Sequence, residues 1–120
     1  ITEEGMDDVI DCTRLYWVDG VIATGPTMER SCLKGYSPAQ LQKIGSGGIS
    51  GRGIGERSLK AVSYLRAHAG KSLLIVGAGG IITPADARRM LDAGANLIQI
   101  YSSFIYEGPG IVKKMIQEIK

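Results

Sequence analysis

The sequence predicts an α/β fold in which parallel strands form part of a (β/α)8 TIM barrel. Near-continuous apolar runs, which we expect to be strands, alternate with segments of helical periodicity. Two of these runs end in small or hydroxyl residues, at Gly79-Gly80 and at Tyr101-Ser102, as strands do where a barrel presents backbone N–H groups to a phosphate. Because a complete barrel takes about 250 residues, we expect residues 1–120 to form a single barrel fragment.

The beginning of the chain is expected to hold one helix and one strand. Residues 2–15 have helical periodicity, with Thr2 as the N-cap and acidic residues in the first turn. The apolar run over residues 18–24 is typical of a strand. The helix face expected to lie inward carries Met6, Val9, Ile10 and Thr13.

Residues 25–56 have no sustained period, and they contain eight glycines and two prolines. This composition predicts one long loop. Loops longer than about 15 residues are uncommon in compact domains unless they serve a site. We therefore expect the 25–56 loop to contribute to a binding site.

The next helix and strand are expected over residues 57–68 and 72–78, with Gly70 ending the helix. Thr83, Pro84 and Asp86 then predict a helix start, because they supply a hydroxyl N-cap, a proline in the first turn and the acid of a capping box. The inward stripe of the 57–68 helix carries Leu59, Val62, Leu65 and Ala69.

The helix that starts at Thr83 is expected to end at Gly94, and a strand over residues 96–102 follows it. Gly108-Pro109 then introduces a last helix. The residues of this helix expected to lie inward are Val112, Met115, Ile116 and Ile119.

Composition and charge exclude several classes of function. The net charge of +2 includes no basic block, and aromatic residues make up only 6% of the chain, so nucleic-acid binding is not expected. No apolar run approaches the roughly 20 residues of a membrane span, so no membrane segment is expected. Cys12 and Cys32 are too few for a zinc set or a disulfide framework, which favours a reducing, cytoplasmic compartment and predicts no metal site.

The glycine turn at residues 77–80 has three interpretations. A dinucleotide-binding turn would need a further glycine where Ile82 stands, and no acidic residue follows at the required distance, so this interpretation fails. A phosphate-binding turn of a barrel fits better, because glycines let the backbone approach a phosphate closely. The alternative without a ligand is a strand-to-helix turn that needs positive φ at Gly79 or Gly80.

The position of Tyr101 and Ser102, one βα unit after Gly79-Gly80, favours a shared binding site for the two segments. In barrels, the loops after two neighbouring strands often share one phosphate. Tyr101 could also be an ordinary strand aromatic. Elsewhere, His68 is expected on an exposed helix surface and Cys32 is expected to be an inert thiol, because neither has a partner at a suitable spacing.

Three segments carry a specific resemblance to a known family. They are Gly47-Gly48-Ile49-Ser50-Gly51, then Ile75-Val76-Gly77-Ala78-Gly79-Gly80-Ile81, then residues 93–109 with Tyr101-Ser102 inside them. In order and spacing these segments resemble the C-terminal part of dihydroorotate dehydrogenase, a flavin enzyme of pyrimidine synthesis. The Tyr-Ser ending and the form of the 47–51 segment are similar to the class 2, quinone-using branch.

The resemblance implies an FMN-dependent oxidoreductase fold and the last three βα units of its barrel. In the family, dihydroorotate gives a hydride to FMN while a base removes a proton, and the flavin then passes electrons to a quinone. An inner-membrane association is implied if the chain is part of a complete class 2 enzyme. The positions expected to bind FMN are Thr24, Gly51, Gly79, Gly80, Tyr101 and Ser102, and among them Gly80, Tyr101 and Ser102 are expected around the phosphate.

The chain departs from the family where the substrate should be held. After the strand expected over residues 18–24, the family carries an Asn and then a hydroxyl residue. Here Gly25 and Pro26 occupy those two places. Gly has no side chain, and Pro also lacks a backbone donor. The family's base and its lysine near the flavin match no position in this chain. We therefore expect no catalytic residue and no turnover by this chain alone.

Two alternatives stay open. The chain is either a flavin-phosphate module of this family or a non-catalytic half-barrel that binds phosphate ligands or assembles with itself. Another barrel isomerase or synthase would account for Gly79-Gly80 but not for the 47–51 segment. Three strands cannot close a barrel and leave both sheet edges open, so we expect a partner, either further copies of this chain or a missing N-terminal half.

Overall fold

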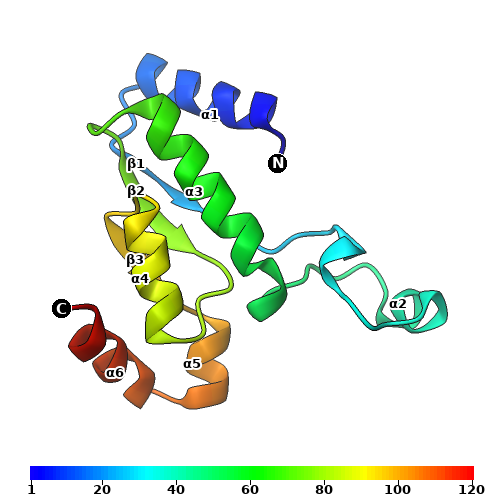
Figure 1. Cartoon of the computed structure of the whole chain (residues 1–120). Helices are drawn as coiled ribbons and strands as arrows, with labels where there is room; N and C mark the ends of the chain where they lie inside the picture. Colours follow the sequence, from blue (N-terminus) through cyan, green and yellow to red (C-terminus); the bar gives the residue numbers. More distant parts are fainter.

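The computed structural model, which describes residues 1–120, is built on a parallel sheet with the strand order β1-β2-β3 (Figure 1). The strands are β1 (Gly20–Ala23), β2 (Leu74–Ala78) and β3 (Leu97–Gln99). The prediction of a parallel α/β sheet is confirmed. The helices are α1 (Glu3–Leu15), α2 (Pro38–Ile44), α3 (Gly55–Ala69), α4 (Pro84–Asp92), α5 (Ser102–Glu107) and α6 (Gly110–Ile119), with 3-10 turns η1 (Arg30–Cys32) and η2 (Arg52–Ile54).

One face of the sheet forms the core with the helices. Ala23 pairs with Gly77, and Gly77 pairs with Ile98, so these three residues form a row across that face. A Cβ atom on Gly77 would lie 2.3 Å from the Met90 Cγ, so glycine is needed for α4 to pack this closely on β2. Ile75, next to Gly77 on the same face, is fully buried.

The other face of the sheet is apolar and has no helix over it. Ile22, Val76 and Leu97 form a row across it, because Ile22 pairs with Val76 and Val76 with Leu97. The exposed fractions of Ile22 and Leu97 are 64% and 56%. Because both faces of the sheet are apolar, the strand sequences are nearly continuous apolar runs.

Local capping signals decide where α1 and α4 begin. The Thr2 Oγ1 accepts a hydrogen bond from the Gly5 N–H at 3.1 Å. At α4, the Thr83 Oγ1 accepts from the Asp86 N–H at 3.2 Å, and the Asp86 carboxylate accepts from the Thr83 N–H at 2.9 Å. Both predicted helix starts are confirmed, and the α1 face carrying Met6, Ile10 and Thr13 is buried as expected.

The 25–56 segment is not irregular throughout. It contains α2, which begins at a capping box formed by Ser37 and Gln40 around Pro38. Figure 1 shows α2 on an arm, the segment between Thr27 and Ile49, that extends away from the sheet. No residue of α2 is buried. The arm leaves and returns through an antiparallel bridge between Thr27 and Ile49.

Of the expectations about the end of the chain, one is wrong and another is wrong in part. The strand predicted over 96–102 ends at Gln99, and Ser102 is the first residue of a short helix, α5. In α6 the buried residues are Ile111 and Met115. Of the predicted inward residues, Met115 is buried and Ile119 is partly buried against the core, but Val112 and Ile116 are exposed. The packing of α6 on α4 buries Ile111 instead.

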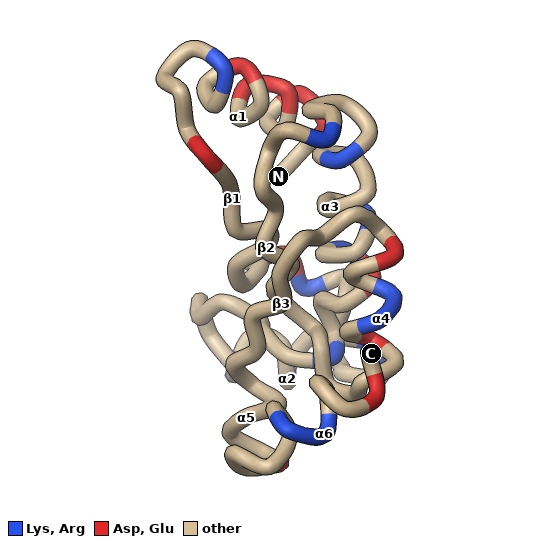
Figure 2. Tube along the Cα trace, turned by 90° about the vertical axis from the view of Figure 1, so that its left-hand side faces the viewer, with Lys and Arg blue, Asp and Glu red and all other residues tan.

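Charged residues are dispersed along the chain, with a run of acidic residues on α1 (Figure 2). None of the helices combines the length and apolar character that crossing a bilayer would require. No three His, Cys, Asp or Glu side chains gather as a metal site would require.

Candidate functional site

A groove of about 570 Å³ lies at the carboxyl ends of the three strands. Its volume is within the range of about 300–1,000 Å³ that small-molecule sites occupy. The groove is lined by all six residues predicted to bind the cofactor, and by the two residues at the expected substrate positions: Thr24, Gly51, Gly79, Gly80, Tyr101 and Ser102, and Gly25 and Pro26.

Sheet geometry explains why these residues meet. Thr24 follows β1, Gly79-Gly80 follows β2, and Tyr101-Ser102 lies just beyond β3. The carboxyl ends of parallel strands share one edge of the sheet, which is where open α/β sheets bind their ligands. Tyr101 and Ser102 reach this edge as the residues that start α5 and not as strand residues.

The Gly79-Gly80 turn is tightly packed against α3. Both residues have positive φ, +95° at Gly79 and +76° at Gly80. A Cβ atom on Gly80 would lie 2.2 Å from the Gly55 Cα, and one on Gly79 would lie 2.6 Å from the Ser58 Oγ. The fold therefore requires glycine at both positions, independently of any ligand.

Gly51 brings the 25–56 segment back to the groove. Its φ is +81°, and an added Cβ atom would lie 3.8 Å from the Ser102 side chain. The neighbouring Ser50 Oγ accepts a hydrogen bond from the Ser102 Oγ at 3.2 Å. The returning segment thus contacts the start of α5.

Thr24 is fixed by two hydrogen bonds. Its N–H donates to the Ala78 carbonyl at 2.7 Å, which continues the ladder between β1 and β2. Its Oγ1 lies 2.7 Å from the Ser58 Oγ, and either hydroxyl can donate. Ser58 is fully buried on α3. Sequence analysis missed Ser58, because a buried serine on a helix face carries no motif.

No charged side chain lines the groove. An adjoining cavity of about 230 Å³ shares Gly79 and Gly80 with it and is lined by Arg52 and Asp86. Burial raises the pKa of Asp86, but hydrogen bonds from Thr83 and Ile82 and the charge of Arg52 outweigh burial and hold that pKa below its usual value. An anion in the groove would therefore rely on backbone N–H groups and hydroxyls, because Arg52 lines the adjoining cavity and not the groove.

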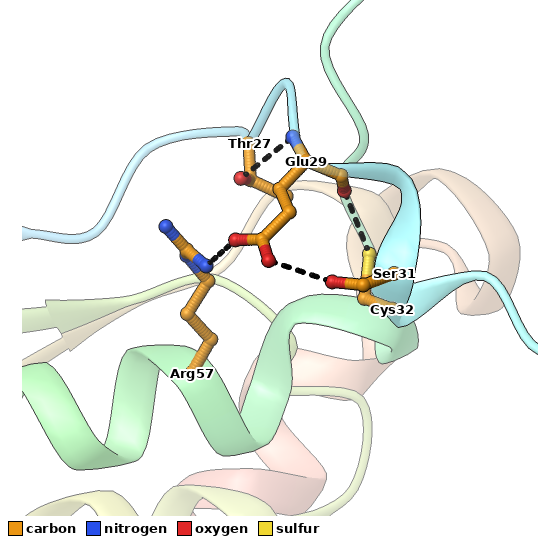
Figure 3. Close-up of polar contacts among 5 residues, drawn as sticks. All are labelled: Thr27, Glu29, Ser31, Cys32 and Arg57. Atoms are coloured by element: carbon orange, nitrogen blue, oxygen red, sulfur yellow. Dashed lines mark hydrogen bonds and ion pairs between the residues drawn. The ribbon is translucent and has the colours of Figure 1, made fainter.

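The arm is anchored to α3 by a polar cluster (Figure 3). Glu29 forms an ion pair with Arg57 of α3 and accepts a hydrogen bond from the Ser31 Oγ at 2.8 Å. The Ser31 hydrogen bond and the Arg57 guanidinium hold the pKa of Glu29 below its usual range. The Cys32 Sγ donates to the Glu29 carbonyl at 3.4 Å.

Two other expected positions lie outside the groove. Cys32 is a free thiol in the arm's anchor. His68 is exposed and stacks on Tyr64, with 3.9 Å between the ring centroids, as expected for a surface histidine.

Comparison with known proteins assigns the family. A family model described as dihydroorotate dehydrogenase matches residues 1–120. A dihydroorotate dehydrogenase (quinone) of Kineococcus radiotolerans is 42% identical over 120 residues, covering 99% of this chain and 32% of that protein. One of Christiangramia forsetii is 38% identical over 119 residues, covering 99% of this chain and 34% of that protein. The chain spans about a third of the length of these curated relatives.

Solved structures agree with this assignment. The ligand-free dihydroorotate dehydrogenase of Eimeria tenella matches with a TM-score of 0.87 and 32% identity, covering 99% of this chain and 32% of that one. Its complex with ferulenol matches with a TM-score of 0.84, covering 99% of this chain and 30% of that one. From the parallel sheet, the residues gathered at its edge and a match over its whole length, we conclude that this chain belongs to the dihydroorotate dehydrogenase family.

Proposed function

We propose that this chain supplies the FMN-phosphate-binding part of a dihydroorotate dehydrogenase and does not oxidise dihydroorotate by itself. The observation that carries the proposal is the groove, where six residues from four separate places in the sequence line one cavity. They are the residues that the family resemblance marks for FMN.

The groove fits a flavin phosphate in its chemistry. Glycines at positions 51, 79 and 80 keep side chains away from the backbone there, and the Ser102 hydroxyl lies at the same edge. We assign the phosphate to Gly80, Tyr101 and Ser102, and the rest of the flavin to the region of Gly51 and Thr24. When bound, FMN would supply hydride-accepting chemistry, and the protein would place it.

The substrate side of the groove supports the second half of the proposal. Gly25 and Pro26 are exposed and offer no side-chain hydrogen bond to a pyrimidine. A site that recognises its substrate by hydrogen bonds is strongly weakened when one of the hydrogen-bonding partners is missing. No residue of the chain matches the family's base, and a base must lie within hydrogen-bond reach of the proton that it removes.

We assign electron transfer to a quinone, and a place in pyrimidine synthesis, to the complete enzyme of which this chain corresponds to a third. The alternative is a half-barrel without catalytic function that binds phosphate ligands or assembles with itself. The exposed Gly25-Pro26 pair and the uncovered sheet face favour this alternative.

Flavin titration of the purified chain tests the proposal. FMN fluorescence should be quenched on binding, and inorganic phosphate should displace the flavin. Riboflavin, which lacks the phosphate, should bind more weakly than FMN. A colourless protein that binds neither flavin would support the alternative.

Charge at Ser102 tests the position of the phosphate. Ser102→Asp places a carboxylate at the proposed phosphate site, so FMN affinity should fall about tenfold or more while riboflavin affinity changes little. Ser63→Asp is the matched control, because Ser63 is exposed on α3 away from the groove. Equal FMN affinity in the two variants would contradict the assignment. Turnover of dihydroorotate with an artificial quinone, above a flavin-only blank, would contradict the proposed lack of activity.

A further inference from the structure

Ser58 is a buried hydroxyl that serves a residue of the groove. It lies on α3 with none of its surface exposed, and its Oγ lies 2.7 Å from the Thr24 Oγ1. Thr24 is its only side-chain hydrogen-bond partner. Buried serines in helices commonly bond to a backbone carbonyl of the preceding turn, but this one bonds to Thr24, the residue that follows β1.

We propose that Ser58 is a positioning residue that orients the Thr24 hydroxyl toward a flavin in the groove. The inference rests on the proposed flavin function. Since each hydroxyl has one hydrogen to donate, the hydrogen bond between them fixes what Thr24 presents to the groove. When Ser58 donates, the Thr24 hydrogen is free for an acceptor on the ligand, and when Thr24 donates, its remaining lone pair is free for a donor.

Gly79 makes this arrangement possible. An added Cβ atom there would lie 2.6 Å from the Ser58 Oγ and 3.2 Å from the Thr24 carbonyl oxygen. The glycine turn after β2 therefore leaves the space in which the two hydroxyls meet. Three elements, the ends of β1 and β2 and the first turn of α3, converge on this one hydrogen bond.

The position of Thr24 predicts which part of the ligand depends on Ser58. Thr24 follows β1 and Ser102 lies beyond β3, with β2 between them. Neighbouring strands are about 4.8 Å apart, so the two residues are separated by roughly two strand spacings. Ser58 should therefore influence the part of the flavin away from the phosphate.

A double-mutant cycle tests the inference. Ser58→Ala and Thr24→Val should each lower the affinity for both FMN and riboflavin about fivefold, the effect expected for one hydrogen bond. The double variant should lose no more than Thr24→Val alone, because Ser58 acts through Thr24. Inorganic phosphate should bind Ser58→Ala as it binds the wild-type chain, measured by calorimetry. Ser63→Ala on the exposed face of α3 is the matched control.

The possible results separate this inference from the proposed function. Flavin affinity unchanged by Ser58→Ala, additive losses in the double variant, or an equal loss of phosphate affinity would each overturn the positioning role. A wild-type chain that binds no flavin would overturn the proposed function, and this inference with it. If Ser58→Ala melts at too low a temperature for titration, Ser58→Cys keeps the buried volume, and it too should lower flavin affinity without changing phosphate affinity.

Discussion

Gly80 and Gly55 are packed so closely that a Cβ atom on Gly80 would lie 2.2 Å from the Gly55 Cα. The turn after β2 therefore rests on the first residue of α3. A side chain at Gly80 meets this backbone before it can obstruct a ligand. Substituting Gly80 thus acts on the fold first.

Gly80→Ala should lower the free energy of unfolding by about 2–5 kcal/mol, through a left-handed backbone and a steric overlap. Gly35→Ala is the matched control, because Gly35 has a similar φ of +85° but nothing within 4 Å of an added Cβ atom. That control should cost only about 1–2 kcal/mol. Urea unfolding of the two variants measures the difference, and equal losses would show that the contact with Gly55 is unimportant.

Arg66 joins α3 to the segments that lead into β2 and β3. Its guanidinium donates to the Gly94 carbonyl at 2.9 Å, the Leu73 carbonyl at 3.0 Å and the Asn96 Oδ1 at 2.7 Å. The same Asn96 oxygen accepts from the Ile75 N–H at 2.9 Å. One planar group therefore satisfies several loop acceptors at once.

Arg66→Lys should lower the free energy of unfolding by about 2–4 kcal/mol, because an ammonium cannot reproduce the planar fork. Arg88→Lys provides the comparison, since Arg88 donates to a single carbonyl, that of Ile119, at 2.7 Å. The loss there should stay below about 1 kcal/mol. Thermal or urea unfolding checks both values, and a loss at Arg66 no larger than at Arg88 would refute the role of Arg66.

Asp86 should make the chain less stable in acid. Its pKa in the folded state is below its usual value of 3.8. At pH values above the pKa of the unfolded state, the Asp86 carboxylate therefore stabilises the fold in full. This contribution is lost as the pH falls through the lower, folded-state pKa. The expected window therefore begins near pH 4 and extends downward.

Asp86→Asn should flatten the fall of melting temperature below about pH 4, because the amide can still cap α4 but does not titrate. Asp92→Asn, an exposed position at the other end of α4, serves as the control. Melting curves between pH 6 and pH 2.5 provide the measurement. An acid slope that is as steep in Asp86→Asn as in Asp92→Asn would refute the assignment.

Local signals in the sequence were sufficient where an element depends on a few neighbouring residues. Thr83 and Asp86 predicted the start of α4 in this way. Ser37 and Gln40 carry the same capping-box spacing and do start α2, but the many glycines around them favoured a loop. A capping box therefore deserved more weight than the composition of its surroundings.

Other features of the fold and of the site depend on tertiary contacts between distant residues. Ile111 and Val112 are both apolar, and only the packing of α6 on α4 decides that Ile111 is buried. The groove residues could be grouped from the sequence, because the ends of parallel strands share one edge. Ser58 could not, because its bond to Thr24 joins residues 34 positions apart without a repeated spacing. Binding of FMN by the groove residues stays a prediction.

Self-association through the uncovered sheet face is the last expectation. Ile22 and Leu97 lie on that face, on the two edge strands, with Val76 between them. Burying such apolar surface stabilises association by about 25 cal/mol per Å², and both edges also offer unpaired backbone groups. We therefore expect the isolated chain to form dimers or larger assemblies at micromolar concentration.

Leu97→Lys should shift the isolated chain toward monomer, because the ammonium group would have to be buried in the contact between copies. Ile44→Lys is the matched control: Ile44 is 51% exposed, close to the 56% of Leu97, but it lies on α2 in the arm. Sedimentation velocity over a concentration series distinguishes the two variants. A wild-type chain that sediments at the mass of one copy, and that melts cooperatively, would show that the uncovered face does not need a second copy. Equal assembly of both lysine variants would instead place the contact elsewhere, away from the row that Ile22, Val76 and Leu97 form.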